Sequence, residues 1–85
     1  MKQFTYRVVE RQGFHARNAM AFARQAGEYQ SSVHIQHKAG TADGKNVLDI
    51  MRLAIKEDDT VIFVVEGEDE EQAASYLQAL VREIL

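Results

Sequence analysis

Apolar residues recur along the chain with two spacings, one typical of strands and the other of helices. Alternation and short runs of β-branched and aromatic residues predict strands at residues 4–9, 32–37, 41–42 and 60–65. The last of these is almost continuously apolar, which favours a place in the middle of a sheet. Turns that contain glycine follow several of these segments.

A helix is predicted at residues 16–26, with Gly27 as its stop. Its expected apolar face repeats at i, i+3, i+4, i+7 and i+10 and consists of Ala16, Ala19, Met20, Ala23 and Ala26. Phe14, just ahead of this helix, is expected to pack back on Ala19 as a hydrophobic staple.

Two further helices are predicted, one after Asn46 and one after Asp69. Asn46 is expected to act as an N-cap, with Asp49 accepting a hydrogen bond from the cap in return, and Asp69 forms the same pattern with Gln72. The last helix carries an apolar stripe of Ala73, Leu77, Leu80, Val81 and Ile84. The middle helix is apolar around most of its circumference, through Val47, Leu48, Ile50, Met51, Leu53 and Ala54. A short helix buries only one side, so we expect part of this one to form a docking surface.

The order β-α-β-β-α-β-α indicates an α+β fold. We expect an open-faced sandwich in which three helices cover one face of a mostly antiparallel four-stranded sheet. Residues 1–85 are expected to form a single domain.

Composition narrows the classes of function. The chain has no cysteine, so disulfides and thiolate metal sites are excluded. Its longest apolar run, residues 61–65, is far too short to cross a bilayer, and no signal-peptide core stands at the start. A formal net charge of −3 argues against nucleic-acid binding. We therefore expect a soluble, cytoplasmic protein without a nucleic-acid or membrane partner. We also expect it to be a monomer.

His15 is the residue best placed for chemistry. It stands where the first predicted helix begins, and the first N–H groups of a helix, here those of Ala16, Arg17 and Asn18, have no intrahelical partner. The positive end of the helix dipole disfavours a protonated imidazole and attracts an added anion. A neutral imidazole, free N–H groups and Arg17 together suit a phosphoryl group, with His15 as the nucleophile. A capping or surface histidine is the alternative reading.

Two other patterns are set aside as metal sites. His34 and His37 are three apart in a predicted strand and therefore point to opposite faces. The acidic residues 66–71 lack the alternating ligand spacing of an EF-hand and are read as a solvated helix start. No metal or cofactor is expected.

The stretch Gly13-Phe14-His15-Ala16-Arg17 resembles the active-site motif of the histidine-containing phosphocarrier protein (HPr) family of the bacterial phosphoenolpyruvate-dependent sugar phosphotransferase system. The resemblance covers essentially the whole chain, including its length, its order of elements and residues 45–53. It implies an HPr-like sandwich and a carrier that is phosphorylated in trans rather than an enzyme with turnover of its own.

The resemblance also implies roles for particular residues. His15 would accept a phosphoryl group on Nδ1, as pros-phosphohistidine, from enzyme I and pass it to an enzyme II A-type domain. Arg17 would help to hold the phosphate. Both partners would dock transiently on an exposed apolar patch, which Val47, Leu48 and Met51 match.

The chain departs from the family at two positions. Asn18 stands where a proline is usual, so the helix start keeps one more N–H donor and loses the rigidity of a proline ring. Asn46 stands where many members carry a serine that a regulatory kinase phosphorylates, so we expect that switch not to operate. Both departures leave open which branch of the phosphotransferase system the chain serves: sugar transport, a nitrogen-type regulatory branch or a specialised operon.

A function of another class is also open. The chain would then be a non-catalytic regulatory module of the same fold that binds a partner through Val47, Leu48 and Met51, with His15 vestigial. A small hydrolase ranks last because no second catalytic group accompanies His15.

Overall fold

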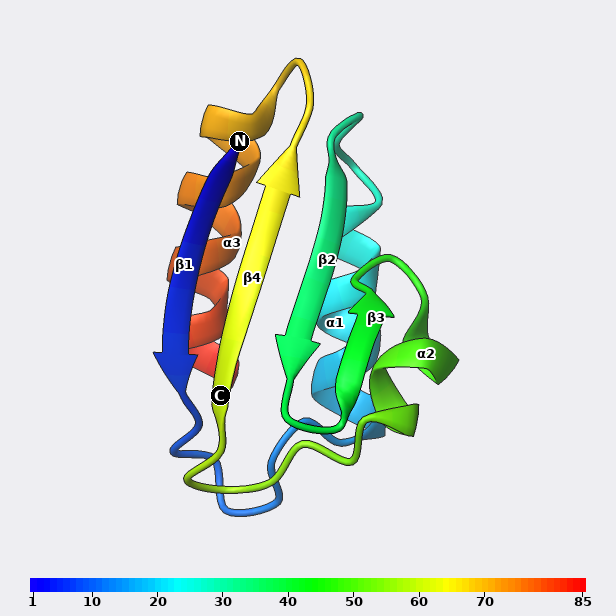
Figure 1. Ribbon diagram of the computed structural model, residues 1–85, viewed down its shortest axis with the longest axis vertical. Helices are drawn as coiled ribbons and strands as arrows, with labels where there is room; N and C mark the ends of the chain where they lie inside the picture. The colour runs from blue at the N-terminus through cyan, green and yellow to red at the C-terminus, as the bar shows by residue number, and fades with distance from the viewer.

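The computed structural model describes residues 1–85 and contains four strands and three helices in the expected order. They are β1 (Lys2–Arg7), α1 (Ala16–Ala26), β2 (Ser32–His37), β3 (Gly40–Asp43), α2 (Val47–Arg52), β4 (Thr60–Glu66) and α3 (Glu70–Ile84). The strands form one sheet in the order β1-β4-β2-β3, and all neighbouring pairs are antiparallel. Helices α1 and α3 lie behind one face of the sheet, while α2 lies beside α1 at the β3 edge (Figure 1). The predicted open-faced α+β sandwich is confirmed, with the apolar β4 in the middle of the sheet.

Pairing with β4 places β1 two residues earlier than the apolar pattern predicted. The register sets Lys2–Arg7 opposite residues 60–65. Val8 is buried outside this ladder, and its N–H donates to the carbonyl of Asp59 at 2.9 Å. Val9, expected inside the strand, is 67% exposed. Val8 and Val9 continue the apolar pattern of β1 but lie after its last residue, so the predicted strand extended beyond the observed end.

Helix α1 has the predicted bounds, but its buried face is rotated. Three of the expected residues are buried: Ala19, Ala23 and Ala26. Ala16 and Met20 are exposed, and Phe22, outside the predicted face, is fully buried. The Phe22 ring meets Phe14 edge-on, with centroids 5.7 Å apart, and lies 5.4 Å from the ring of Phe63. Burial of this large side chain sets the orientation of the helix.

Helix α2 begins at the predicted cap. The side-chain oxygen of Asn46 accepts the backbone N–H of Asp49 at 3.0 Å. The expected return bond is wrong, because the Asp49 carboxylate accepts instead from the N–H of Asp43 at 2.8 Å and from the guanidinium of Arg52 at 3.0 Å. Those two partners, the Asp43 N–H first, hold the pKa of the Asp49 carboxyl below its usual range.

The connections gather at the two ends of the elongated molecule. The start of α1, the end of α3 and the loop between α2 and β4 lie at one end, and the turns before β2 and α3 lie at the other (Figure 1). Between them, 21 buried apolar residues form the core. All three helices lack the length and apolarity needed to cross a bilayer.

Candidate functional site

A tight loop delivers His15 to the start of α1. Gly13 has a φ of +70°, and a Cβ there would lie 2.3 Å from the carbonyl oxygen of Ile55, so only glycine fits. The N–H of Phe14 donates to that same oxygen at 3.0 Å, and the Phe14 ring is buried. His15 follows, half-buried, with extended backbone (φ −95°, ψ 179°), as the N-cap residue of α1. The structure therefore has His15 at the helix start that the sequence predicted.

No acidic side chain caps the start of α1. The N–H groups of Ala16, Arg17 and Asn18 make no hydrogen bond, and the His15 side chain does not cap them. The first turn contains no acidic residue. Arg17 is exposed and its guanidinium forms neither an ion pair nor a hydrogen bond. Such a set of free donors at the positive end of a helix can hold the oxygens of an anion.

His15 faces a shallow hollow of about 510 Å³. The hollow is lined by Glu10, Gln12, His15, Arg17, Asn18, Ala21, Glu83 and Ile84. Of the predicted phosphate-binding residues, Arg17 and Asn18 line it and Ala16 does not. Arg17 supplies the only guanidinium in the wall, and Glu10 and Glu83 supply carboxylates. A phosphoryl group there would be attracted by the helix start and by Arg17 against the repulsion of both carboxylates.

The Asn18 side chain has contacts that the sequence did not reveal. It is 5% exposed, and its Nδ2 donates to the carbonyl of Gly13 at 2.9 Å and to that of Ile84 at 3.3 Å. Its Oδ1 is buried without a partner. Sequence reasoning found only a backbone N–H at this position, because Ile84 lies 66 residues away along the chain.

The predicted docking residues differ in exposure. Leu48 is 82% exposed and Met51 37%, whereas Val47 is partly buried against the core. None of the three lines the hollow at His15. The exposed apolar surface expected on α2 is therefore present, with Leu48 as its most prominent member.

Helix α1 adds residues that the sequence analysis missed. A second hollow, of about 440 Å³, is lined by Arg17, Met20, Ala21 and Arg24. Met20, assigned to the core from its spacing, is 55% exposed. The signal was available, since Arg17, Met20 and Arg24 stand at i, i+3 and i+7 and so share one face. Arg17 and Ala21 line both hollows, which makes the surface continuous along α1.

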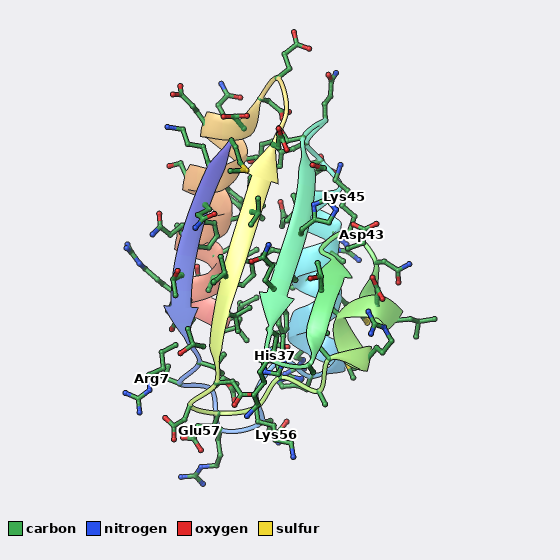
Figure 2. All side chains as sticks on the ribbon, in the orientation of Figure 1. Arg7, His37, Asp43, Lys45, Lys56 and Glu57 are labelled. Carbon is green, nitrogen blue, oxygen red and sulfur yellow. The ribbon has the colours of Figure 1, made fainter.

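The other histidines belong to different surroundings. His34 is exposed on β2, as a polar strand residue should be. The His37 side chain is only 2% exposed, and its Nε2 lies 2.7 Å from Asp59 Oδ2 while its Nδ1 accepts the N–H of Ala39. The N–H of Lys56, and then His37, lower the pKa of Asp59 to about 2. Figure 2 shows His37 and Lys56 at the same end of the molecule. Both ring nitrogens of His37 are engaged, so this histidine ties two turns together.

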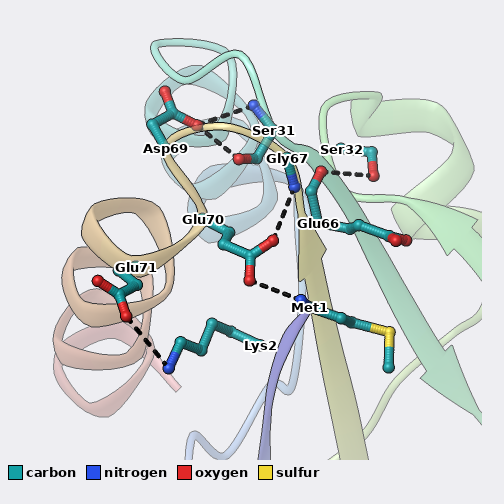
Figure 3. Close-up of polar contacts among 9 residues, drawn as sticks. All are labelled: Met1, Lys2, Ser31, Ser32, Glu66, Gly67, Asp69, Glu70 and Glu71. Carbon is teal, nitrogen blue, oxygen red and sulfur yellow. Dashed lines mark hydrogen bonds and ion pairs between the residues drawn. The ribbon is translucent and has the colours of Figure 1, made fainter.

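The acidic residues Glu66, Asp69, Glu70 and Glu71 lie around the start of α3 (Figure 3), which is at the opposite end of the molecule (Figure 1). The expected cap by Asp69 with Gln72 is wrong, because the Asp69 side chain makes no cap bond. Its carboxylate accepts instead from the Ser31 hydroxyl at 2.5 Å and from the N–H groups of Ser31 and Gln30 at 3.0 and 2.9 Å. The Ser31 hydroxyl, followed by the N–H of Gln30, holds the pKa of the Asp69 carboxyl below its usual range. Residues 1–85 contain no group of three or more histidine, aspartate or glutamate side chains that could hold a metal.

Known proteins share this arrangement. Residues 2–83 match the family model of the HPr component of the phosphotransferase system, described as its phosphorylation site. The phosphocarrier protein HPr of Lysinibacillus sphaericus is 33% identical over 84 residues, which cover 99% of this chain and 96% of that protein. The HPr-like protein Crh of Bacillus subtilis is 31% identical over 71 residues, 84% of each chain. An HPr structure from Thermoanaerobacter tengcongensis matches with a TM-score of 0.91 at 29% identity, over 98% of this chain and 93% of that one. The chain belongs to the HPr family of phosphocarrier proteins of the phosphotransferase system.

Proposed function

We propose that this chain accepts a phosphoryl group from enzyme I on His15 and passes it to an enzyme II A-type domain. The observation that carries the proposal is the open start of α1 beside His15, with three unbonded N–H groups and an unpaired Arg17 guanidinium. Membership of the HPr family supports it. The chain is then a protein substrate phosphorylated in trans, not an enzyme in its own right.

The chemistry requires one nucleophile and several anion-holding donors. The lone pair of Nδ1 on the neutral His15 ring attacks phosphorus, and an N–P bond forms as the bond to the donor breaks. The electron pair of the broken bond stays with the donor, and the product is a pros-phosphohistidine. Negative charge spreads over the three equatorial oxygens in the transition state. The N–H groups of Ala16, Arg17 and Asn18 and the Arg17 side chain then neutralise that charge. Transfer onward repeats the step in reverse, with the acceptor as nucleophile.

Docking uses the exposed apolar residues near this site. Leu48 and Met51, with Val47 beside them, form one part, and Met20 between Arg17 and Arg24 forms the other. An apolar centre with arginines at its border is the usual composition of a protein interface. One surface serves donor and acceptor in turn, so each complex must be transient.

We propose a cytoplasmic monomer as the working form. A crystal structure of Bacillus subtilis Crh, 29% identical to this chain, is described as an intertwined, swapped dimer. Sedimentation at micromolar concentration tests the proposal, which expects the mass of one chain and fails if a dimer predominates.

The decisive experiment is incubation with phosphoenolpyruvate and a bacterial enzyme I, followed by mass spectrometry under alkaline conditions that preserve phosphohistidine. The expected product carries one acid-labile phosphoryl group on His15. His15→Ala should take up none while its circular dichroism spectrum stays that of the parent. Labelling of the variant, or no labelling of the parent by several enzymes I, contradicts the proposal.

A regulatory module is the second candidate, favoured by the similarity to Crh and by the exposure of Leu48. This function needs the docking surface but no phosphate on His15. A binding partner whose affinity is the same for the parent, for His15→Ala and for the phosphorylated chain supports the module over the carrier.

A further inference from the structure

We propose that Asn18 is a positioning residue for the phosphoryl acceptor, because its buried amide ties the loop before His15 to the last turn of α3. The inference rests on the proposed function of His15 and adds a side chain to it. Nδ2 is shared by two carbonyl oxygens, that of Gly13 at 2.9 Å and that of Ile84 at 3.3 Å. Gly13 stands two residues before His15, so the first of these bonds acts directly on the loop that carries the imidazole.

The other restraints on this loop act on its own turn, on the loop before β4 and, at its start, on Leu85 after α3, whose carbonyl accepts the N–H groups of Val9 and Glu10. The N–H of Gly13 donates to the carbonyl of Glu10 at 2.9 Å, which closes the turn on itself. The N–H of Phe14 donates to Ile55, which fixes the loop to the segment between α2 and β4. The Asn18 amide adds a hydrogen-bonded link from Gly13 to α3. Without it, the Gly13 carbonyl has no hydrogen-bond donor. Gly13 and Phe14 then keep only the hydrogen bonds that their own backbone N–H groups donate.

Burial supports a specific role for the amide. Asn18 is 5% exposed, and the side chain leaves Oδ1 buried without a partner. A residue that only filled space here would be better apolar, because an unpaired buried oxygen is unfavourable. The two Nδ2 hydrogen bonds explain why an amide is present here. They fix the part of the hollow's wall that Asn18 and Ile84 form beside His15.

Placement of the nucleophile matters for the rate of transfer. A displacement of about 1 Å of a reacting group can lower a rate by about 100-fold. The apolar docking residues Leu48, Met51 and Met20 make no hydrogen bond with Asn18 and lie outside this hollow. Loss of the Asn18 amide should therefore slow the chemical step and leave docking unchanged.

The test compares the parent with Asn18→Ala and with Asn18→Leu, which keeps the same branching at Cγ without the Nδ2 donor. Gln25→Ala, on the same helix, is the matched control. Each chain is assayed as a substrate of enzyme I, and amide hydrogen exchange is measured at Phe14. Both Asn18 variants should show a kcat about 10-fold lower or more, with KM within two-fold of the parent and faster Phe14 exchange. The control should match the parent in all three.

The outcomes separate this inference from the proposed function. A parent that takes no phosphate refutes the carrier, and Phe14 exchange still decides whether Asn18 holds the loop. If Asn18→Ala fails to fold, Asn18→Leu gives the result. A folded Asn18 variant with unchanged kcat overturns the positioning role, even if its melting temperature falls, because a purely structural residue changes only the melting temperature. Unchanged Phe14 exchange overturns the role equally.

Discussion

The starts of α1 and α3 lie at opposite ends of the molecule and carry opposite charge. The first turn of α3 contains Glu70 and Glu71, and the Glu70 carboxylate accepts the N–H of Gly67 at 3.1 Å. The first turn of α1 contains no acidic residue and has Arg17 instead. One helix thus has carboxylates of its own at its positive end, and the other leaves that end open next to a histidine.

This difference shows what makes one helix start suitable for a phosphoryl group. Every helix start has a positive dipole and unbonded N–H groups, so the fold alone does not select a site. Carboxylates at the start of α3 would repel a phosphate. The start of α1 forgoes the cap that an Asp or Ser at its N-cap position would provide, a cost of about 0.5–2 kcal/mol in stability. His15, the proposed nucleophile, occupies this N-cap position instead.

The largest expected effect comes from reversing the charge of one start at a time. Arg17→Glu should lower the rate of phosphoryl uptake from enzyme I by about 10- to 100-fold, because charge-assisted hydrogen bonds worth about 1.5–3 kcal/mol are lost. Glu71→Arg, at the start of α3, should leave the rate within two-fold of the parent. Initial rates at one ionic strength measure both. Equal losses in the two variants would mean that overall charge, and not the start of α1, governs uptake.

The second effect concerns docking beside the open start. Met51→Glu should weaken enzyme I binding by more than about 1 kcal/mol, since it places a charge in an apolar contact. The melting temperature should change little, because Met51 is 37% exposed. Tyr76→Glu is the matched control on α3, where Tyr76 is 45% exposed. Titration calorimetry and thermal melts distinguish the two roles: a large fall in melting temperature for Met51→Glu assigns that residue to the core.

A third, smaller effect compares a capped helix start with the uncapped one. Asn46→Ala should lower the free energy of unfolding by about 0.5–2 kcal/mol, because the bond to the Asp49 N–H is lost. His15→Ala has no cap bond to lose and should stay close to the parent. Urea denaturation measures both. A loss at His15 as large as that at Asn46 would show that the imidazole stabilises the helix after all.

The smallest expected effect is the response of the α3 end to acid. The pKa of Asp69 lies below its ordinary value of 3.8 in the folded chain, chiefly through the Ser31 hydroxyl. The stabilisation is therefore fully present above about pH 4 and is lost as pH falls below 3.8 towards the lower folded value. Asp69→Asn should be less stable than the parent at pH 7, with the difference narrowing below pH 4. A difference that stays constant across that range contradicts the assignment.

Local patterns predicted the elements well and their surroundings less well. Alternation located β2 with its bounds, because Val33 and Ile35 both face the core. The face of α1 was misjudged because alanine and methionine fit a helical stripe as well as Phe22 does, and only packing against the sheet decides which side is buried. The capping pair predicted for α2 was half right for a similar reason: Asn46 caps the helix, but the Asp49 carboxylate accepts the N–H of Asp43 in β3 instead of returning a bond to the cap.

The candidate site was predictable where its parts are adjacent in the chain. His15 and Arg17 are separated by one residue, so their shared place at a helix start follows from sequence. The bonds of Asn18 to Ile84 and of His37 to Asp59 join residues 66 and 22 apart, and no local pattern signals them. Long-range contacts of this kind become visible only when the sheet brings the loops together.

The measurement that tests the central claim most directly is a pair of ¹H–¹⁵N NMR spectra, recorded before and after phosphorylation by enzyme I. We expect the largest shifts at the amides of Ala16, Arg17 and Asn18, because their N–H groups gain phosphoryl oxygens, and little change at Glu70 and Glu71. His15→Ala should give identical spectra under both conditions. A phosphorylated chain in which the three α1 amides stay unshifted would contradict the account.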